Sequence, residues 1–180
     1  MRHSTAWIQQ AESDLKAGKK VDNPQDPPTF CQAISKYHQA LEKAVKAVAS
    51  VLQHGSVFPG GPGKKHPVAP LLSAILKIPR SDDNRDLMRK LDRVFSPSLR
   101  QELKELDALA PVYPAPSTPH ARNHEYPFQN SIDDWQPPCA EDAFASGEMK
   151  RFRATAENIY SALRKTVDGL ERVYPQRAIL

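Results

Sequence analysis

The sequence predicts an all-α protein, an up-and-down bundle of four long helices and one short helix. Apolar residues recur every three or four positions along most of the chain, which is the period of one helix face. The 17 prolines gather between these periodic stretches, where they mark boundaries. Only 7% of the residues are aromatic, and the apolar stripes are mostly Leu, Ile, Val and Ala, which suits helices packed on helices.

The length of 180 residues, with 39% hydrophobic and 26% charged residues, fits a single domain over residues 1–180. The formal charge of +4 indicates a mild preference for anionic partners. No apolar run approaches the roughly 20 residues of a membrane span, and the N-terminus lacks the apolar region of a signal peptide. We therefore expect a soluble, cytoplasmic protein without a membrane partner, in which Cys31 and Cys139 remain thiols.

The first helix is predicted over Ser4 to Lys16, with Ser4 as its N-cap and Gly18 as its end. The proline-rich run VDNPQDPP then predicts a loop, because each proline disfavours helical geometry in the residue before it. The apolar stripe of this helix consists of Trp7, Ile8, Ala11 and Leu15.

The central helix is predicted over Phe30 to Gly55, with Asp26 and Pro27 marking its start. Gly55 is expected to supply the left-handed residue that ends it. The polar face places Glu42 four residues before Lys46, a spacing that favours an ion pair, and most of that face is expected to be exposed to water. The apolar stripe consists of Phe30, Ile34, Tyr37, Leu41, Ala44, Val45, Val48 and Leu52.

A glycine- and proline-rich connection, SVFPGGPGKKHP, follows the central helix. It is not a Walker phosphate-binding loop, because Phe58 stands where that motif needs glycine and Lys65 where it needs Ser or Thr. A short helix is then predicted from His66 to Leu76, with Pro79 ending it.

The next stretch is predicted to form either one bent helical unit or two helices. Asp82 or Asp83 is expected to cap its start, and Ser96 followed by Pro97 is a second cap signal. The apolar residues are Leu87, Leu91, Val94 and Phe95, and then Leu99, Leu103, Leu106 and Leu109.

Residues 111–139 hold seven of the prolines and show no sustained period, so we predict a long Pro-rich loop. The final helix is predicted over Met149 to Tyr174, with Gly147 separating it from a short turn around Ala143 and Phe144. No segment favours a strand over a helix.

The segment ARNHEYPF, residues 121–128, carries the most informative polar cluster. Arg122 offers a planar set of donors suited to phosphate, His124 can titrate near neutral pH, and Tyr126 can stack on a base. Alternatively, Tyr126 and Phe128 hold the loop on the bundle while Arg122 and His124 satisfy backbone carbonyls.

Neither a metal site nor a catalytic nucleophile is predicted. The metal candidates His120, His124 and Glu125 follow Pro119 in a loop, so their spacing does not place the rings on one helical face. The sequence contains no G-x-S-x-G motif and no zinc-binding cysteine spacing. We therefore expect no metal and no cofactor.

Three segments, WIQQAESDLKAG, YHQALEKAVKAV and HPVAPLLSAI, resemble the HEPN family (higher eukaryotes and prokaryotes nucleotide-binding). Ala11, Asp14 and Leu15 match its A-x-x-D-L run, and His66 matches its histidine at the start of helix three. The ARNHEYPF segment is similar to the R-Y-P segment of the family, and looks especially like the HEPN domain at the end of the chaperone-like protein sacsin. The Q-A-x-E-K-A-x-K-A run of the family is matched by Gln39, Ala40, Glu42, Lys43, Ala44, Lys46 and Ala47.

The resemblance implies a bundle of about five helices, often dimeric, that binds nucleotides or RNA. Many members are metal-independent ribonucleases, either toxins paired with a nucleotidyltransferase or parts of antiviral systems. These use an arginine followed by a histidine after four to six intervening residues. None of the six histidines here has an arginine at that spacing, and Arg122 and His124 have only Asn123 between them.

We therefore predict a non-catalytic HEPN-type binding and dimerisation module for a nucleotide, RNA or another phosphate-bearing ligand. One alternative is a toxin or defence ribonuclease with Arg122 and His124 as a rearranged pair. Another is a purely structural dimerisation domain of a larger protein. The expected partners are a second copy or a cognate protein such as a nucleotidyltransferase. The candidate ligand contacts are Arg122, Asn123, His124 and Tyr126, with electrostatic help from Lys43, Lys46, Lys64 and Lys65. The polar face of the central helix is expected to lie against the ARNHEYPF segment.

Overall fold

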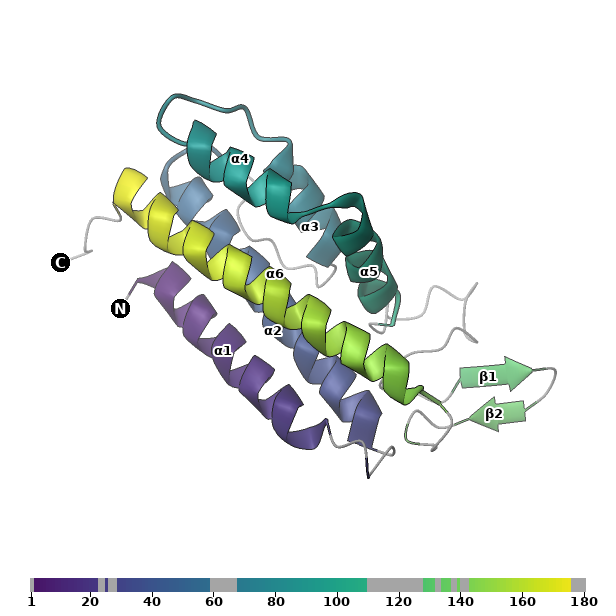
Figure 1. Ribbon diagram of the computed structural model, residues 1–180. Helices are drawn as coiled ribbons and strands as arrows, with labels where there is room; N and C mark the ends of the chain where they lie inside the picture. The colour runs from purple at the N-terminus through teal and green to yellow at the C-terminus, as the bar shows by residue number, and fades with distance from the viewer. Residues whose placement is uncertain are drawn as a thin grey trace.

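The computed structural model describes residues 2–22, 25, 29–58, 68–109, 128–131, 134–136, 139 and 143–175. These residues form six helices and one two-stranded hairpin (Figure 1). None of the described helices combines the length and apolar character that a membrane span requires. In chain order the elements are α1 (His3–Val21), α2 (Phe30–His54), α3 (Val68–Leu76), α4 (Arg85–Val94), α5 (Pro97–Ala108), β1 (Phe128–Ser131), β2 (Asp134–Gln136) and α6 (Ser146–Val173).

The predicted all-α class is confirmed, with α2 at the centre of the bundle. Helix α1 runs antiparallel to α2, whereas α6 runs in the same direction as α2 and packs against both helices (Figure 1). Helices α4 and α5 follow each other as a bent segment along the other side of α6, with α3 between this segment and α2. The described part of the chain thus has three long and three short helices, not four long and one short, because the chain breaks at Ser96 and Pro97.

The core is built around α2, which is buried on nearly all sides. Every residue from Ala44 to Leu52 is buried, including Lys46 and Ser50. Because every side of this stretch is buried, other helices must cover it all round, and α1, α3, α5 and α6 supply the cover. The largest side chains packed in this core include Phe30, Tyr37, Ile34, Leu41, Leu52, Phe95 and Phe152.

The ends of α1 differ from the prediction. The N-cap position is Arg2, and Ser4 lies inside the helix, where its hydroxyl donates a 2.5 Å hydrogen bond to Glu171 of α6. Gly18 does not end the helix, which continues to Val21. A Cβ at Gly18 would lie 2.7 Å from Cε1 of Tyr37, so this glycine is needed for the close approach of α1 and α2.

The ends of α2 also need correction. The helix begins at Phe30 after Thr29, which occupies the N-cap position, whereas Asp26 and Pro27, which were predicted to mark the start, lie outside the described residues. At the other end Gly55 has an ordinary φ of −73°, and the left-handed residue is Ser56 at 58°. Gly55 is instead a contact position, because a Cβ there would lie 2.7 Å from the Tyr174 ring.

The start of α4 is capped by neither Asp82 nor Asp83. Asn84 occupies the N-cap position, and its Oδ1 accepts a 3.0 Å hydrogen bond from the backbone N–H of Ser81. Val94 is exposed, whereas Phe95 next to it is buried, so Val94 does not belong to the core face. The predicted Ser96 cap of α5 is confirmed, since its hydroxyl accepts a 3.2 Å bond from Leu99 N–H.

The hairpin of β1 and β2 was missed, because runs of four and three residues are too short to display a period. The strands are antiparallel, with Phe128 opposite Gln136 and Gln129 opposite Trp135. The last helix begins at Ser146, so Gly147 lies in its first turn and does not precede it. Ala143 and Phe144 are buried just before it.

Candidate functional site

The predicted ligand contacts of the proline-rich loop fall on residues that the structure does not describe. Arg122, Asn123, His124 and Tyr126 lie in the gap between Leu109, which follows α5, and Phe128, where β1 begins. Lys64, Lys65 and His66 lie in the gap between Phe58 and Val68. Of the predicted set, only Lys43 and Lys46 on α2 have described positions.

Lys43 is bonded to Asp14 of α1. Its ammonium donates directly to Asp14 Oδ2, and the Nζ of Lys36 lies 3.6 Å from the other carboxylate oxygen. The Asp14 side chain is only 7% exposed. A buried carboxylate of this kind requires a cation beside it, so the charge of Lys43 is used to join α1 to α2.

Lys46 is even more enclosed, with its side chain 7% exposed. Its Nζ lies 2.5 Å from Glu42 Oε1 and 5.5 Å from the centroid of the Trp7 ring, a cation–π contact. The prediction of the Glu42–Lys46 ion pair is confirmed. The expectation that this face is mostly exposed to water is wrong, because α1 covers much of it.

His3 extends this arrangement across the α1–α2 contact. Its Nε2 accepts a 3.0 Å hydrogen bond from the indole N–H of Trp7, and its Nδ1 is 3.1 Å from the hydroxyl of Ser50. Trp7 and Lys46 therefore belong to a set of side chains that satisfy one another at the seam between the two helices. This seam consists of His3, Trp7, Asp14, Lys36, Glu42, Lys43, Lys46 and Ser50.

A second polar cluster joins the ends of α1 and α6 through α2. Asp22 Oδ2 accepts a 2.7 Å bond from the Tyr37 hydroxyl and lies 2.7 Å from Nε of Arg153. Arg153 also donates to the Asp22 carbonyl at 3.3 Å. Burial raises the pKa of Tyr37 well above its usual value, so the phenol stays protonated and continues to donate. Sequence reasoning missed this cluster, since Asp22 and Arg153 are 131 positions apart.

A third cluster is centred on Asp107 at the end of α5. Its Oδ1 lies 2.8 Å from His38 Nε2 and accepts a 2.8 Å bond from Val68 N–H, and its Oδ2 accepts a 2.7 Å bond from Ala69 N–H. The carboxylate thereby satisfies two N–H groups in the first turn of α3. The ring of His38 on α2 lies against this carboxylate, where α2, α3 and α5 meet.

The described residues contain no group of three or more His, Cys, Asp or Glu side chains that could hold a metal ion. The metal candidates His120, His124 and Glu125 fall in a gap of the description. Cys31 is buried, and burial raises the pKa of its thiol, which makes it a poor nucleophile.

The arrangement is therefore that of a helical bundle in which the described buried polar groups hold helices together. Residues 4–110 match the model of the HEPN domain family, and the chain belongs to that family. The matched range runs from α1 through α5 and contains both the Asp14–Lys43 pair and the Asp107 cluster. Comparisons with curated proteins and with solved structures found no match. At the family level, the HEPN domain is a module of the nucleotide-binding or ribonuclease type.

Proposed function

We propose that this HEPN domain binds a nucleotide or another phosphate-bearing ligand, does not cleave RNA, and acts as a dimer. The observation that supports the non-catalytic part most directly is the absence from the sequence of an arginine and a histidine at the ribonuclease spacing. The family ribonucleases depend on an arginine and a histidine that act together on the reacting atoms. No histidine of this chain has an arginine at that spacing, so this pair is missing.

Two of the three described histidines, His3 and His38, support the same proposal, whereas the third, His54, is exposed at the end of α2. His3 is bonded to Trp7 and Ser50, and His38 is bonded to Asp107, so both rings serve helix packing. Nδ1 of His3 and Nε2 of His38 each lie within hydrogen-bond distance of a residue on another helix. A role in proton transfer would require breaking those contacts.

The ligand contacts remain those proposed from the sequence, Arg122, Asn123, His124 and Tyr126. Lys43 and Lys46 are less suited to help, because their charges already face Asp14 and Glu42. Lys64 and Lys65 remain the proposed electrostatic help. Planar arginine donors with a nearby aromatic ring suit a phosphate joined to a base.

Isothermal titration calorimetry with ATP, GTP and a short RNA tests the binding proposal. We expect saturable heat with at least one of them, lost in Arg122→Ala and retained in Arg172→Ala. Arg172 is an exposed arginine in the last turn of α6 and serves as the matched control. An absence of heat with all three ligands at millimolar concentration would refute the proposal.

The non-catalytic and dimeric parts need their own measurements. Incubation with labelled RNA in EDTA should leave the RNA intact. Cleavage that disappears in the Arg122→Ala, His124→Ala double variant would instead identify a ribonuclease. Light scattering should give twice the monomer mass, and a monomer mass at high concentration would contradict the dimer.

A further inference from the structure

The two cysteines of the chain, Cys31 and Cys139, are far apart in the sequence but lie at the same end of the bundle. Cys31 is buried in the first turn of α2, whereas Cys139 is exposed and lies between β2 and α6. The structure holds both as thiols. Neither residue belongs to the proposed nucleotide site, so a role for them does not rest on that site.

The first turns of α2 and α6 lie side by side at one end of the bundle. The two helices run in the same direction and pack against each other (Figure 1). The hydroxyl of Tyr37 lies 3.3 Å from Nε of Arg153. Tyr37 is seven positions after Phe30, the first residue of α2, and Arg153 is seven positions after Ser146, the first residue of α6. Because both helices rise by about 1.5 Å per residue, this contact places their starts at nearly the same height.

The chain reaches α6 through a stretch that is packed against this end of the bundle. Ala143 and Phe144, just before α6, are buried and belong to the core. Cys139 is four positions before Ala143 and belongs to no helix or strand. Four residues span at most about 14 Å even when they are fully extended. Cys139 therefore stays close to the end of the bundle at which Cys31 lies.

The two thiols also interact electrostatically. Burial raises the pKa of the Cys31 thiol, and the charge of Cys139 raises it further. Charges more than about 10 Å apart are largely screened at ordinary salt concentrations, so this effect fits two sulfur atoms that are near each other. With its raised pKa, Cys31 has little reactive thiolate near neutral pH, whereas the exposed Cys139 can meet a reagent from solution.

We propose that Cys31 and Cys139 are a site of reversible oxidation, at which a small-molecule disulfide such as oxidised glutathione converts them into one intramolecular disulfide. A disulfide requires Cα atoms about 5.5–6 Å apart. Cys139 can adjust to this distance without breaking a helix or a strand, because it belongs to neither. The bond would fasten the chain that enters α6 to the first turn of α2.

Oxidation takes two exchange steps. The Cys139 thiolate first attacks one sulfur of oxidised glutathione, whose S–S bond breaks, so that a Cys139–glutathione disulfide forms and one glutathione thiolate leaves. The Cys31 thiolate then attacks the Cys139 sulfur and displaces the second glutathione as a thiolate. The two glutathione thiolates take up the two protons that the cysteines lost, and the two electrons from the cysteines reduce the glutathione disulfide. Proximity offsets the small thiolate fraction of Cys31, because the second step is intramolecular.

Incubation of the full-length chain with oxidised glutathione tests the proposal. Mass spectrometry should show the loss of two hydrogens from the chain, and proteolysis without reductant should release a Cys31 peptide joined to a Cys139 peptide. The melting temperature should rise by about 5–15 °C, because the bond closes a loop of roughly 100 residues in the unfolded chain. Dithiothreitol should reverse both changes, and Cys139→Ser should show neither of them.

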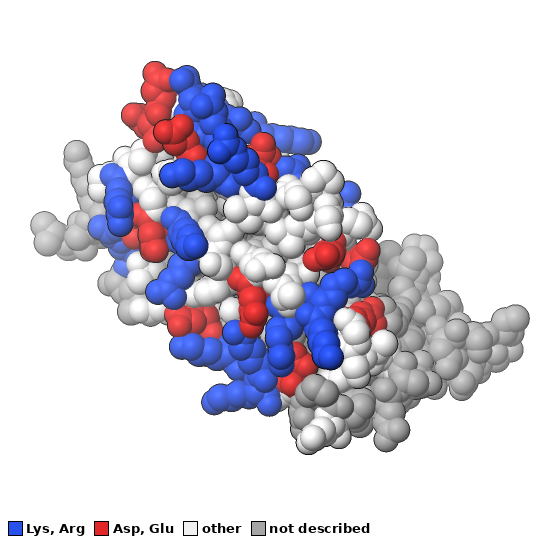
Figure 2. Space-filling model, viewed as in Figure 1, with Lys and Arg blue, Asp and Glu red and all other residues white. Residues whose placement is uncertain are grey.

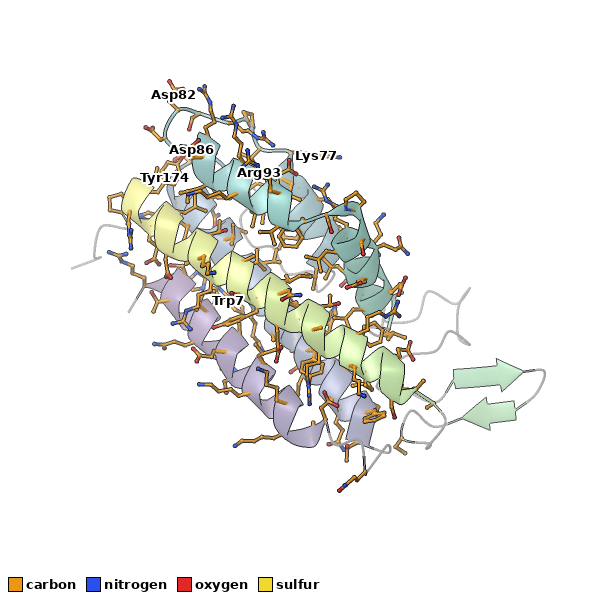
Figure 3. The ribbon with its side chains drawn as sticks, viewed as in Figure 1. Trp7, Lys77, Asp82, Asp86, Arg93 and Tyr174 are labelled. Atoms are coloured by element: carbon orange, nitrogen blue, oxygen red, sulfur yellow. The ribbon has the colours of Figure 1, made fainter. Side chains whose placement is uncertain are left out.

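A cysteine at the other end of the bundle gives the matched control. Asp82 has a side chain that is 89% exposed, and Asn84 near it bonds to Tyr174, which follows the end of α6. Figure 3 labels Asp82 and Tyr174 at this end, and Figure 2 shows charged side chains of both signs exposed there. The double variant Cys139→Ser, Asp82→Cys keeps two cysteines in the chain. It should form a mixed disulfide with glutathione at the introduced cysteine but no bond to Cys31.

Three outcomes would overturn the proposal. One is glutathione that stays on Cys139 while Cys31 remains a thiol. Another is a dimer linked through two copies of Cys139 in place of the intramolecular bond. The third is a bond to Cys31 that forms as readily in the Asp82→Cys control, because a distant cysteine reaches the buried Cys31 only when the chain unfolds.

Discussion

Asp14 of α1 and Lys43 of α2 are two of the residues that carry the HEPN resemblance, and they bond to each other. The two residues are 29 positions apart, on different helices. Since the Asp14 side chain is almost fully buried, its charge is tolerated only because Lys43 and Lys36 face it. A polar signature of this kind does not by itself identify a ligand site, because helix packing explains the same residues.

Replacing Lys43 with methionine should lower the free energy of unfolding by roughly 1–3 kcal/mol, because Asp14 would keep only Lys36 at 3.6 Å. Urea denaturation of the wild type and the variant measures this change. The double variant Asp14→Asn, Lys43→Met should recover part of the loss, since the unpaired buried charge is gone.

Lys16→Met is the matched control, because Lys16 forms a surface pair with Glu12 and its side chain is 69% exposed. A pair of this kind contributes about 0.3–0.5 kcal/mol. Equal losses in the two lysine variants would mean that the Asp14–Lys43 pair contributes no more than a surface pair.

Helices α1 and α2 form the most extensive contact between the described elements, and Gly18 allows their close approach. The ring of Tyr37 lies against the Cα of Gly18, and the Tyr37 hydroxyl is held by Asp22. The ring therefore has little freedom to move away from an added methyl group. At the scale of the element, this glycine is a packing residue inside a helix rather than a helix end.

Gly18→Ala should destabilise the protein by about 1–3 kcal/mol, although alanine favours a helix by about 1 kcal/mol, because the new Cβ would lie 2.7 Å from the Tyr37 ring. Gly147→Ala is the matched control in α6. A Cβ there meets no atom within 4 Å, so this variant should gain a few tenths of a kcal/mol from helix propensity alone. Thermal unfolding followed by circular dichroism compares the two, and a stabilised Gly18→Ala would show that α1 can shift away from α2.

Helix α6 completes the bundle, although the residues that match the HEPN model end at 110. Its buried face packs on α2, and α1, α4 and α5 also contact it. Without α6, the large apolar surface of α2 would face water on one side. The side chains that cover it are Phe152, Ala156, Ile159, Leu163, Val167 and Leu170.

At the scale of the whole molecule, a fragment of residues 1–110 should therefore retain helical circular dichroism but lose cooperative unfolding. We expect it to bind the dye ANS, as compact states with exposed apolar surface do. The full-length chain, measured in the same way, should unfold in one cooperative transition and bind little dye. A fragment that unfolds as cooperatively as the full chain would show that α6 is an addition to a complete core.

Local signals account for what was predicted correctly. The positions of the helices followed from apolar periodicity, which is a property of neighbouring residues. The Ser96 cap was predicted because Ser followed by Pro acts within one turn, whereas the cap of α4 was predicted at Asp82 or Asp83 and lies at Asn84 instead. The two short strands were too short to produce a pattern.

The amino-acid sequence by itself determined the all-α class, the family and the approximate extent of the helices. Only the tertiary structure decided which polar residues are enclosed. Lys46 was expected in water and is buried because α1 lies over it, and Asp22, Tyr37 and Arg153 meet although they are far apart in the chain. The surface groove of about 500 Å³ that Val94, Leu99 and Ala162 help to line likewise depends on how α4, α5 and α6 cross. Periodicity reports which face of a helix is apolar, but the burial of a polar side chain depends on which other helix covers it.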